Sequence, residues 1–115
     1  MNLELEQKEC CEHFDAQYAP IEPNQLVAIS SGIYEGTVPL EGVRYPSPEH
    51  MSGWYLTTDD YDGNIDSLIT VHFSHIVETR PEIALYMALP CGYRFSLGGE
   101  EEHVWFDLEV ANESA

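Results

Sequence analysis

Basic residues are scarce in this chain of 115 residues. Four side chains are Lys or Arg, against 21 that are Asp or Glu, so the formal net charge is −17 at pH 7. Four cations cannot form the basic footprint with which proteins neutralise nucleic-acid phosphates, and an anionic membrane surface would repel the chain. We therefore expect neither nucleic acid nor a membrane as partner. The four cations are Lys8, Arg44, Arg80 and Arg94.

Long apolar runs are missing, and cysteines are few. The longest apolar run, Ile83–Leu89, is far shorter than the roughly 20 residues of a membrane-spanning helix. The opening Met1–Glu6 is acidic, so we expect no secretory signal peptide. The three cysteines are Cys10, its neighbour Cys11 and the distant Cys91. This odd set does not resemble a secreted disulfide framework, and we expect a reduced, cytoplasmic protein.

The acidity does not indicate disorder, because 43% of the residues are hydrophobic and 11% are aromatic. Disordered acidic tails are poor in both. The pattern predicts an α+β fold, a single domain with a mainly antiparallel sheet of about four or five strands and helices packed on one face. Within it, we expect an N-terminal amphipathic helix in residues 1–20, the α+β domain in 21–110 and a frayed tail in 111–115.

Periodicity and turn residues place the individual elements. An acidic segment with a narrow apolar stripe, Leu3–Tyr18, predicts the first helix. A second helix would be capped by Ser74, and Pro81 can occupy the first position of a third, with Ile83, Tyr86 and Met87 facing inward. Residues 35–53 hold three prolines and three glycines, which predicts a long connection with a short edge strand around Val43–Tyr45. The predicted strands are 26–31, 54–58, 68–72 and a hairpin of 93–97 with 104–108.

The acidic run from Asp59 to Asp66 resembles a calcium loop at first sight. An EF-hand loop needs Asp at its first position, Gly at its sixth and Glu at its twelfth. If Gly63 is the sixth residue, Thr58 is first and Ile69 is twelfth, so both key ligands are missing. Two interpretations remain: a solvated turn, or an acidic recognition surface beside neighbouring aromatic residues. Those aromatic residues are Trp54, Tyr55 and Tyr61.

Other combinations of reactive residues are weak. His72 and His75 could share a metal on one helix, but the pattern places them in a strand and a helix. Cys91 and His103 flank a predicted strand without a candidate oxyanion site. Gly98-Gly99 is followed by Glu100–Glu102, which would repel a phosphate. We therefore predict a non-enzymatic protein with no cofactor and no bound metal.

Strong negative charge attracts basic proteins and speeds their association. Charge supplies rate more than affinity, so aromatic anchors such as Trp54, Tyr61 or Trp105 would have to supply the binding hot spots. Carboxylates could then occupy positions that phosphates take in a nucleic-acid-binding cleft. A small acidic protein that covers the basic surface of another protein is the function that this composition favours.

Short motifs in the second half of the chain resemble the immunity protein 33 domain family. The resemblance covers about residues 25–98 and leaves the N-terminal helix outside. It departs from the family at Thr57-Thr58, where a Gly is common, at Arg80, where an Asp is common, and in a longer segment from Glu35 to Ser52. The matching motifs are Ser52-Gly53-Trp54-Tyr55, Asp59-Asp60 with Asp66, the strand 68–72, Arg80-Pro81-Glu82-Ile83, Leu89-Pro90, Gly92 and Phe95.

This resemblance implies a small α+β protein that is encoded beside a bacterial toxin and neutralises it inside the producing cell. It supplies no catalytic residues. Alternatives are an acidic nucleic-acid mimic that inhibits a DNA-binding protein, and a metal-binding module. From charge and aromatic character, rather than from the family, we predict a toxin-binding surface with the following residues. They are Trp54, Asp59, Asp60, Tyr61, Asp62, Asp66, Glu100, Glu101 and Glu102.

Overall fold

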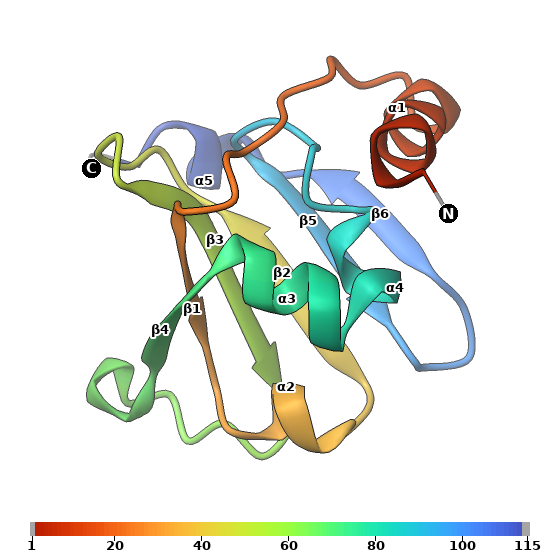
Figure 1. Ribbon diagram of the computed structural model, residues 1–115. Coiled ribbons are helices and arrows are strands. Elements are labelled where there is room, and N and C mark those ends of the chain that lie inside the picture. Colours follow the sequence, from red (N-terminus) through yellow and green to blue (C-terminus); the bar gives the residue numbers. More distant parts are fainter. Residues whose placement is uncertain (1, 114–115) are drawn as a thin grey trace.

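A six-stranded sheet is the main layer of the computed structural model, which describes residues 2–113 (Figure 1). The strand order is β4-β1-β3-β2-β5-β6. β1 and β3 are parallel, and the other neighbouring strands are antiparallel. The predicted α+β class with a mainly antiparallel sheet is confirmed, with six strands where the sequence indicated four or five. The strands are β1 (Leu26–Ile29), β2 (Leu40–Arg44), β3 (Met51–Thr58), β4 (Ile69–His72), β5 (Tyr93–Leu97) and β6 (His103–Phe106).

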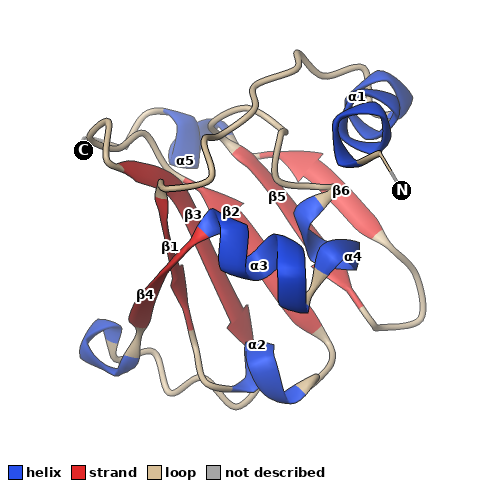
Figure 2. Ribbon diagram, viewed as in Figure 1, coloured by secondary structure: helices blue, strands red, loops and turns tan. Residues whose placement is uncertain are grey.

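Helices cover one face of this sheet and leave much of the other uncovered (Figure 2). α3 (Phe73–Thr79) and α4 (Pro81–Ala84) lie in front of the strands, and α1 (Leu3–His13) contacts α4. The main core lies beneath them and includes Trp54, Phe95, Ile83 and Met87. None of the helices in residues 2–113 has the length and apolar character needed to cross a bilayer. The short helices are α2 (Gly32–Glu35) at one end of the sheet, the 3-10 turn η1 (Ile65–Ser67), and α5 (Leu108–Ala111) behind it.

The helix bounds differ from those predicted. α1 ends at His13 rather than Tyr18, because Asp15 adopts a left-handed conformation with φ 56°. α3 begins at Phe73 after His72, so Ser74 is not its cap. α4 ends at Ala84 and continues as turns, although Ile83, Tyr86 and Met87 are buried as predicted.

The predicted tail is also partly ordered. α5 runs to Ala111, and Val110 within it is buried. Residues 112 and 113 follow this helix as exposed chain, while the predicted frayed residues 114 and 115 lie outside the described part.

β2 is a central strand, which corrects the prediction of a short edge strand around Val43–Tyr45. It pairs with β3 on one side and β5 on the other. Pro39 and Pro46 flank the strand without interrupting its ladder, which is where proline is tolerated in a sheet. Gly42 allows the Phe95 ring to pack directly on the backbone, since a Cβ at this position would collide with that ring.

A bulge in β3 sets which side chains face outward. The register between β1 and β3 shifts between Leu26 and Ala28, and Gly53 adopts φ 90° within the extra residues of β3. A Cβ at Gly53 would collide with the carbonyl oxygen of Tyr45. After the bulge, Trp54 points into the core and Tyr55 points to the opposite face. The Ser52-Gly53-Trp54-Tyr55 motif therefore connects the core to the uncovered face of the sheet.

Candidate functional site

The acidic loop from Asp59 to Asp66 leaves the end of β3 and crosses to β4. Asp62 accepts hydrogen bonds from the backbone N–H of Asn64 at 2.9 Å and from the Ser67 hydroxyl at 3.3 Å. The Asn64 side chain accepts one from the backbone N–H of Asp66 at 3.0 Å, and the Thr58 hydroxyl donates to Asp60. Such side-chain bonds to nearby backbone fix turn geometry. The loop therefore presents its carboxylates from a defined backbone.

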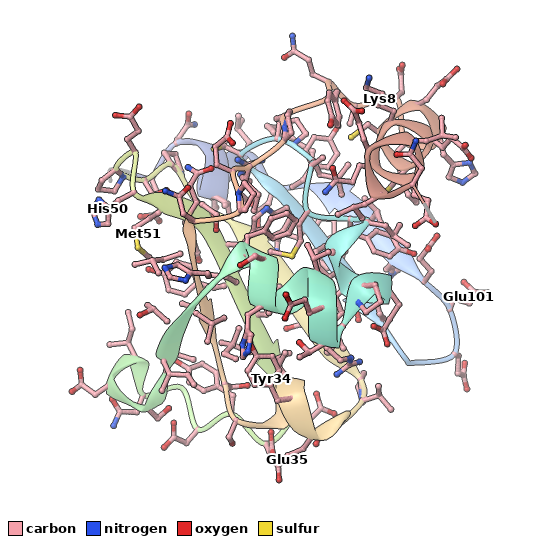
Figure 3. All side chains as sticks on the ribbon, in the orientation of Figure 1. Lys8, Tyr34, Glu35, His50, Met51 and Glu101 are labelled. Atoms are coloured by element: carbon pink, nitrogen blue, oxygen red, sulfur yellow. The ribbon has the colours of Figure 1, made fainter. Side chains whose placement is uncertain are left out.

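The hairpin tip from Gly98 to Glu102 leaves the same end of the sheet. Leu40 pairs with Thr58 on one side and with Leu97 on the other, so both acidic segments begin at one level. Their starting points are two strand spacings apart, about 10 Å. Figure 3 shows Glu35 pointing outward at this end and Glu101 at the hairpin, while His50 and Met51 lie at the opposite end. We call this surface the acidic end, formed by Glu35, Asp59, Asp60, Asp62, Asp66, Glu100, Glu101 and Glu102, all of them exposed.

The carboxylates of α1 approach the same hairpin. A shallow depression between α1 and the hairpin is lined by Glu6, Glu9 and Glu102. The negative charge of Glu102 is one of the causes that raise the pKa of the Cys10 thiol in α1, after burial and the neighbouring Cys11. Glu102 therefore lies close to the carboxylates of α1 as well as to those of the hairpin tip.

Almost none of this negative charge is neutralised within the chain. Three ion pairs occur among the described residues, and they join Lys8 to Glu4, Arg80 to Glu82 and Arg94 to Asp107. Of the 21 acidic residues, all of which the structure describes, 21 − 3 = 18 therefore have no cation from residues 2–113 within 4.0 Å. All eight carboxylates of the acidic end are among these 18.

The fourth cation, Arg44, is buried and bonds to carbonyl oxygens. It donates to the carbonyl of Ser52 at 3.0 Å, and to those of Ala19 and Leu89 at 2.7 Å each. Burial lowers the pKa of this guanidinium from its ordinary value. Arg44 is therefore a structural link between β2, β3, the chain after α1 and the turn after α4. It cannot offset the charge of the acidic end.

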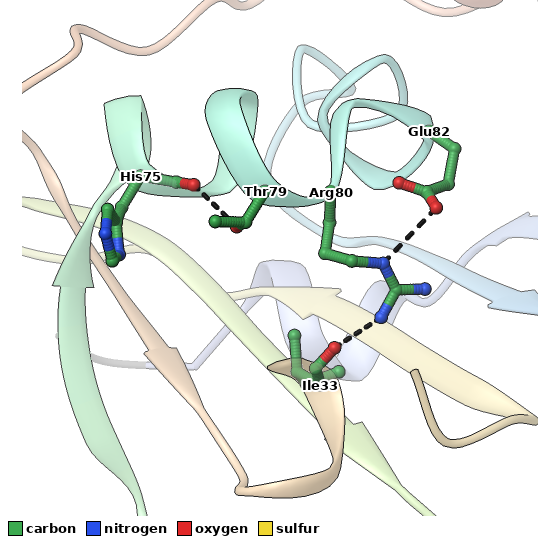
Figure 4. Close-up of polar contacts among 5 residues, drawn as sticks. All are labelled: Ile33, His75, Thr79, Arg80 and Glu82. Carbon is green, nitrogen blue, oxygen red and sulfur yellow. Dashed lines mark hydrogen bonds and ion pairs between the residues drawn. The ribbon is translucent and has the colours of Figure 1, made fainter. Parts of the chain in front are cut away.

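Arg80 fixes α2 beneath the junction of α3 and α4 (Figure 4). Its Nε lies 3.3 Å from the Glu82 carboxylate, and its terminal nitrogen donates to the carbonyl oxygen of Ile33 in α2. Thr79 closes α3 by donating to the carbonyl of His75 at 2.6 Å. Arg80 lies near the acidic end, but two of its three nitrogens already bind Glu82 and the Ile33 carbonyl.

Trp54, which the sequence suggested as an aromatic anchor of the toxin-binding surface, does not lie at the surface. Its side chain is fully buried, and its indole N–H donates to the carbonyl oxygen of Met87 at 2.9 Å. Trp54 can support a surface from below but cannot contact a partner of the folded chain. Trp105 is 36% exposed on the uncovered face, where the Arg94 guanidinium lies 5.4 Å from its ring centroid.

Tyr61 is half-buried, and it lines a groove on the uncovered face of the sheet. The groove has a volume of about 600 Å³, and strands β2 and β3 form its floor. The loop after β2 forms one wall, and the acidic loop with Tyr61 and Ile65 forms the other. We call it the tyrosine groove, and the residues that characterise it are Val43, Tyr45, Pro46, Tyr55, Tyr61 and Glu113.

Sequence reasoning missed the tyrosine groove. Tyr45 and Tyr55 come from neighbouring strands, and their rings meet edge to face with centroids 5.5 Å apart. The alternation of Met51, Gly53, Tyr55 and Thr57 along β3 was the available signal, because these residues share one face of a strand. It could not show that this face is uncovered, or that Tyr45 lies beside it.

The metal and thiol alternatives find little support in the geometry. Within residues 2–113, no three His, Cys, Asp or Glu side chains come together as a possible metal site. His75 is hydrogen-bonded through Nδ1 to the Tyr34 hydroxyl at 2.8 Å. His103 pairs with Ser96, which lies about 10 Å along β5 from Tyr93, whereas Cys91 precedes the start of that strand. The Cys91 thiol instead lies 3.8 Å from the carbonyl oxygen of Tyr45.

Comparison with known proteins gave one result. The model of the Imm33-like domain family matches residues 6–107. The match is longer than residues 25–98, over which the motifs show the resemblance, and it includes most of α1. The expectation that the N-terminal helix lies outside the family region is therefore wrong. Searches of curated proteins and of solved structures gave no significant match.

Proposed function

The chain belongs to the Imm33-like domain family, and we propose from this membership that it is an immunity protein that binds and neutralises a cognate bacterial toxin. In this proposal the chain acts in the cytoplasm of the producing cell and does so as an inhibitor, without catalysis or cofactor. It covers a basic active surface of the toxin. The partner is then a protein, and neither a nucleic acid nor a membrane.

The acidic end is the observation that supports this mode of action. Its eight exposed carboxylates have no cation within 4.0 Å in the described chain. An exposed surface of one sign raises the rate of encounter with an oppositely charged partner by tenfold or more at low salt. The acidic loop is also held by its own hydrogen bonds. A loop that is ordered before binding loses less conformational entropy when the complex forms.

The first test is co-expression of the chain with the toxin domain encoded by the neighbouring gene. We expect growth to be rescued and the two purified proteins to form a complex. The association rate should fall steeply with added NaCl, because salt screens exposed charges beyond about 10 Å at 0.1 M. Absence of both rescue and binding would overturn the proposal. Equal inhibition of unrelated DNA-binding proteins would instead favour a nucleic-acid mimic.

Charge reversal distinguishes the acidic end from general acidity. Asp59, Asp66 and Glu101 are suitable because no hydrogen bond or ion pair of their side chains holds the described fold together. We expect the triple variant Asp59→Lys, Asp66→Lys, Glu101→Lys to associate at least about tenfold more slowly. The control carries the same change in net charge elsewhere, as Glu12→Lys, Glu22→Lys, Glu49→Lys. Equal rates for the two triple variants would exclude the acidic end as the docking surface.

A further inference from the structure

The cations of this chain already show a consistent mode of packing. Lys8 lies 5.3 Å from the ring centroid of Tyr18, and Arg44 lies 5.9 Å from that of Trp54. Arg94 lies 5.4 Å from that of Trp105. A cation within about 6 Å of an aromatic ring is attracted by the electrons of the ring face. Three of the four cations thus lie over aromatic rings, and the fourth, Arg80, is bound to Glu82 and the Ile33 carbonyl.

The tyrosine groove has the rings but not the cations. Within residues 2–113, no Lys or Arg lies over Tyr45, Tyr55 or Tyr61. Glu113 is among the residues that line the groove, and Asp62 stands in the sequence between two lining residues, Tyr61 and Gly63. Half-buried tyrosine rings with a carboxylate in the same lining form a complementary environment for a positively charged side chain from another molecule.

The groove is also continuous with the acidic end. Tyr61 belongs to the same loop as Asp59, Asp62 and Asp66, so a partner drawn to that loop is already beside the groove. On the floor of the groove, Tyr55 pairs with Val43, and Val43 pairs with Arg94 on the next strand. The same face therefore continues toward the Arg94–Trp105 contact.

We propose that the tyrosine groove binds Arg or Lys side chains from a cationic segment of the toxin. The proposal rests on the proposed function and adds to it the second part of the interface, which holds a partner that the acidic end attracts. Occupation by a second copy of the chain is disfavoured, because two molecules of net charge −17 repel each other. The volume of about 600 Å³ is comparable to that of cavities that hold small ligands or a few side chains.

The direct test is an NMR titration of the full chain with a short peptide that alternates Arg and Gly. The matched control is the same peptide with citrulline in place of Arg, which keeps the shape and loses the charge. We expect the Arg peptide to shift the backbone amides of Val43, Tyr55 and Tyr61, and the citrulline peptide to leave them unchanged. Shifts confined to Glu35 and Glu100–Glu102 would overturn the proposal. So would equal shifts from both peptides, or shifts that depend on protein concentration alone.

Two groove variants are used, so that the test does not fail if one of them does not fold. Tyr55→Leu and Tyr61→Leu each remove one ring while keeping an apolar side chain. We expect each to weaken the Arg peptide about two- to fivefold, the effect of an exposed cation–aromatic contact. Tyr34→Leu is the control, since Tyr34 lies outside the groove and bonds to His75. Urea unfolding of each variant confirms that it is folded. Affinities equal to that of the Tyr34 variant would overturn the proposal.

The same variants separate this proposal from the proposed function when they are titrated with the toxin domain. If the toxin binds and the groove variants bind it as tightly as the parent chain, the groove proposal fails and the immunity function stands. If the Arg peptide shifts the groove amides but the toxin neither binds nor is inhibited, the proposed function fails and the groove remains a site for cationic peptides. If the groove variants lose affinity for the toxin while the parent chain and Tyr34→Leu bind it, both the groove proposal and the proposed function are supported.

Discussion

The Trp54 indole nitrogen and the Met87 carbonyl oxygen are 2.9 Å apart and join β3 to the turns that follow α4. The ring packs on Phe95 with centroids 5.3 Å apart, at the centre of the core. Trp54 is preceded by the bulge at Gly53 and followed by Tyr55 of the tyrosine groove. This contact therefore determines the position of the strand that forms the floor of the groove.

Replacing Trp54 by Phe should destabilise the chain by about 2–3 kcal/mol, because it leaves a cavity and removes the donor to a buried carbonyl. Urea unfolding followed by circular dichroism measures the change. The control is Trp105→Phe, which alters an exposed ring and should cost less than about 1 kcal/mol. Equal losses in the two variants would contradict the central role of Trp54.

Replacing Arg44 by Met should cost about 3 kcal/mol or more. The variant leaves the carbonyl oxygens of Ser52, Ala19 and Leu89 without the donors that now bind them. The stability of Arg44→Lys should lie between those of the parent chain and the Met variant, because one ammonium cannot reproduce the fork of the guanidinium. Hydrogen exchange should show faster opening of the segment around Ala19 in the Met variant. Unchanged stability of that variant would mean that water satisfies these carbonyls.

The parts of the fold that the sequence predicted well are those with local signals. The hairpin of β5 and β6 follows from alternating apolar residues on both sides of a Gly-Gly turn. The start of α4 at Pro81 follows from the tolerance of proline at the first helical position. The central place of β2 could not be read from the sequence. It depends on pairing with β5, distant in the chain, and on the fit of Phe95 against Gly42.

The candidate site was predictable in its charge but not in its geometry. The acidic residues could be located along the chain, and their common end follows only from the register of Leu40 with Thr58 and Leu97. Successive strand residues alternate between the two faces, so Trp54 and Tyr55 are expected to point in opposite directions. This alternation does not show which face the helices cover. The sequence therefore suggested Trp54 as an anchor beside Tyr61 and Trp105, whereas the aromatic residues of the uncovered face include Tyr45, Tyr55, Tyr61 and Trp105.

The three thiols should differ strongly in reactivity. Burial raises the pKa of Cys10 to about 12 and also raises that of Cys11, whereas Cys91 is exposed. Because the thiolate is the reactive form, Ellman's reagent should label one thiol in the native chain and all three in denaturant. Cys91→Ser should abolish the native reaction. Rapid labelling of Cys10 in that variant would show that α1 separates readily from the core.

The pair of Arg94 and Asp107 should give the chain a pH-dependent contribution to stability. The hydrogen bond from Arg94, 3.1 Å long, lowers the pKa of the Asp107 carboxyl. A carboxylate with a lowered pKa stabilises the fold above the usual range near 3.9, and that contribution disappears as the pH falls through the folded-state value. Asp107→Asn keeps an acceptor for the backbone N–H of Glu109 but loses the charge.

We therefore expect Asp107→Asn to be less stable than the parent chain near neutral pH, with the difference shrinking as the pH falls below the ordinary aspartate range. Urea midpoints of both proteins across that range measure the effect. Glu109→Gln, which alters an exposed carboxylate without an ion pair, is the control. A difference that stays constant with pH would mean that packing, rather than charge, accounts for the loss.

Added salt should stabilise this chain, because 18 carboxylates have no cationic neighbour among residues 2–113 and repel one another. Raising NaCl to about 0.5 M shortens the Debye length to about 4 Å and screens most of this repulsion. We expect Tm to rise by several degrees, since about 1 kcal/mol corresponds to about 4 °C or more in a domain of this size. The variant Asp59→Asn, Asp66→Asn, Glu101→Gln, which removes three negative charges from the acidic end, should begin with a higher Tm and gain less from salt. If added salt raises the Tm of the parent and of the variant equally, the repulsion is spread over the whole surface. The carboxylates of the acidic end, which the proposed docking requires, would then not be a particular source of instability.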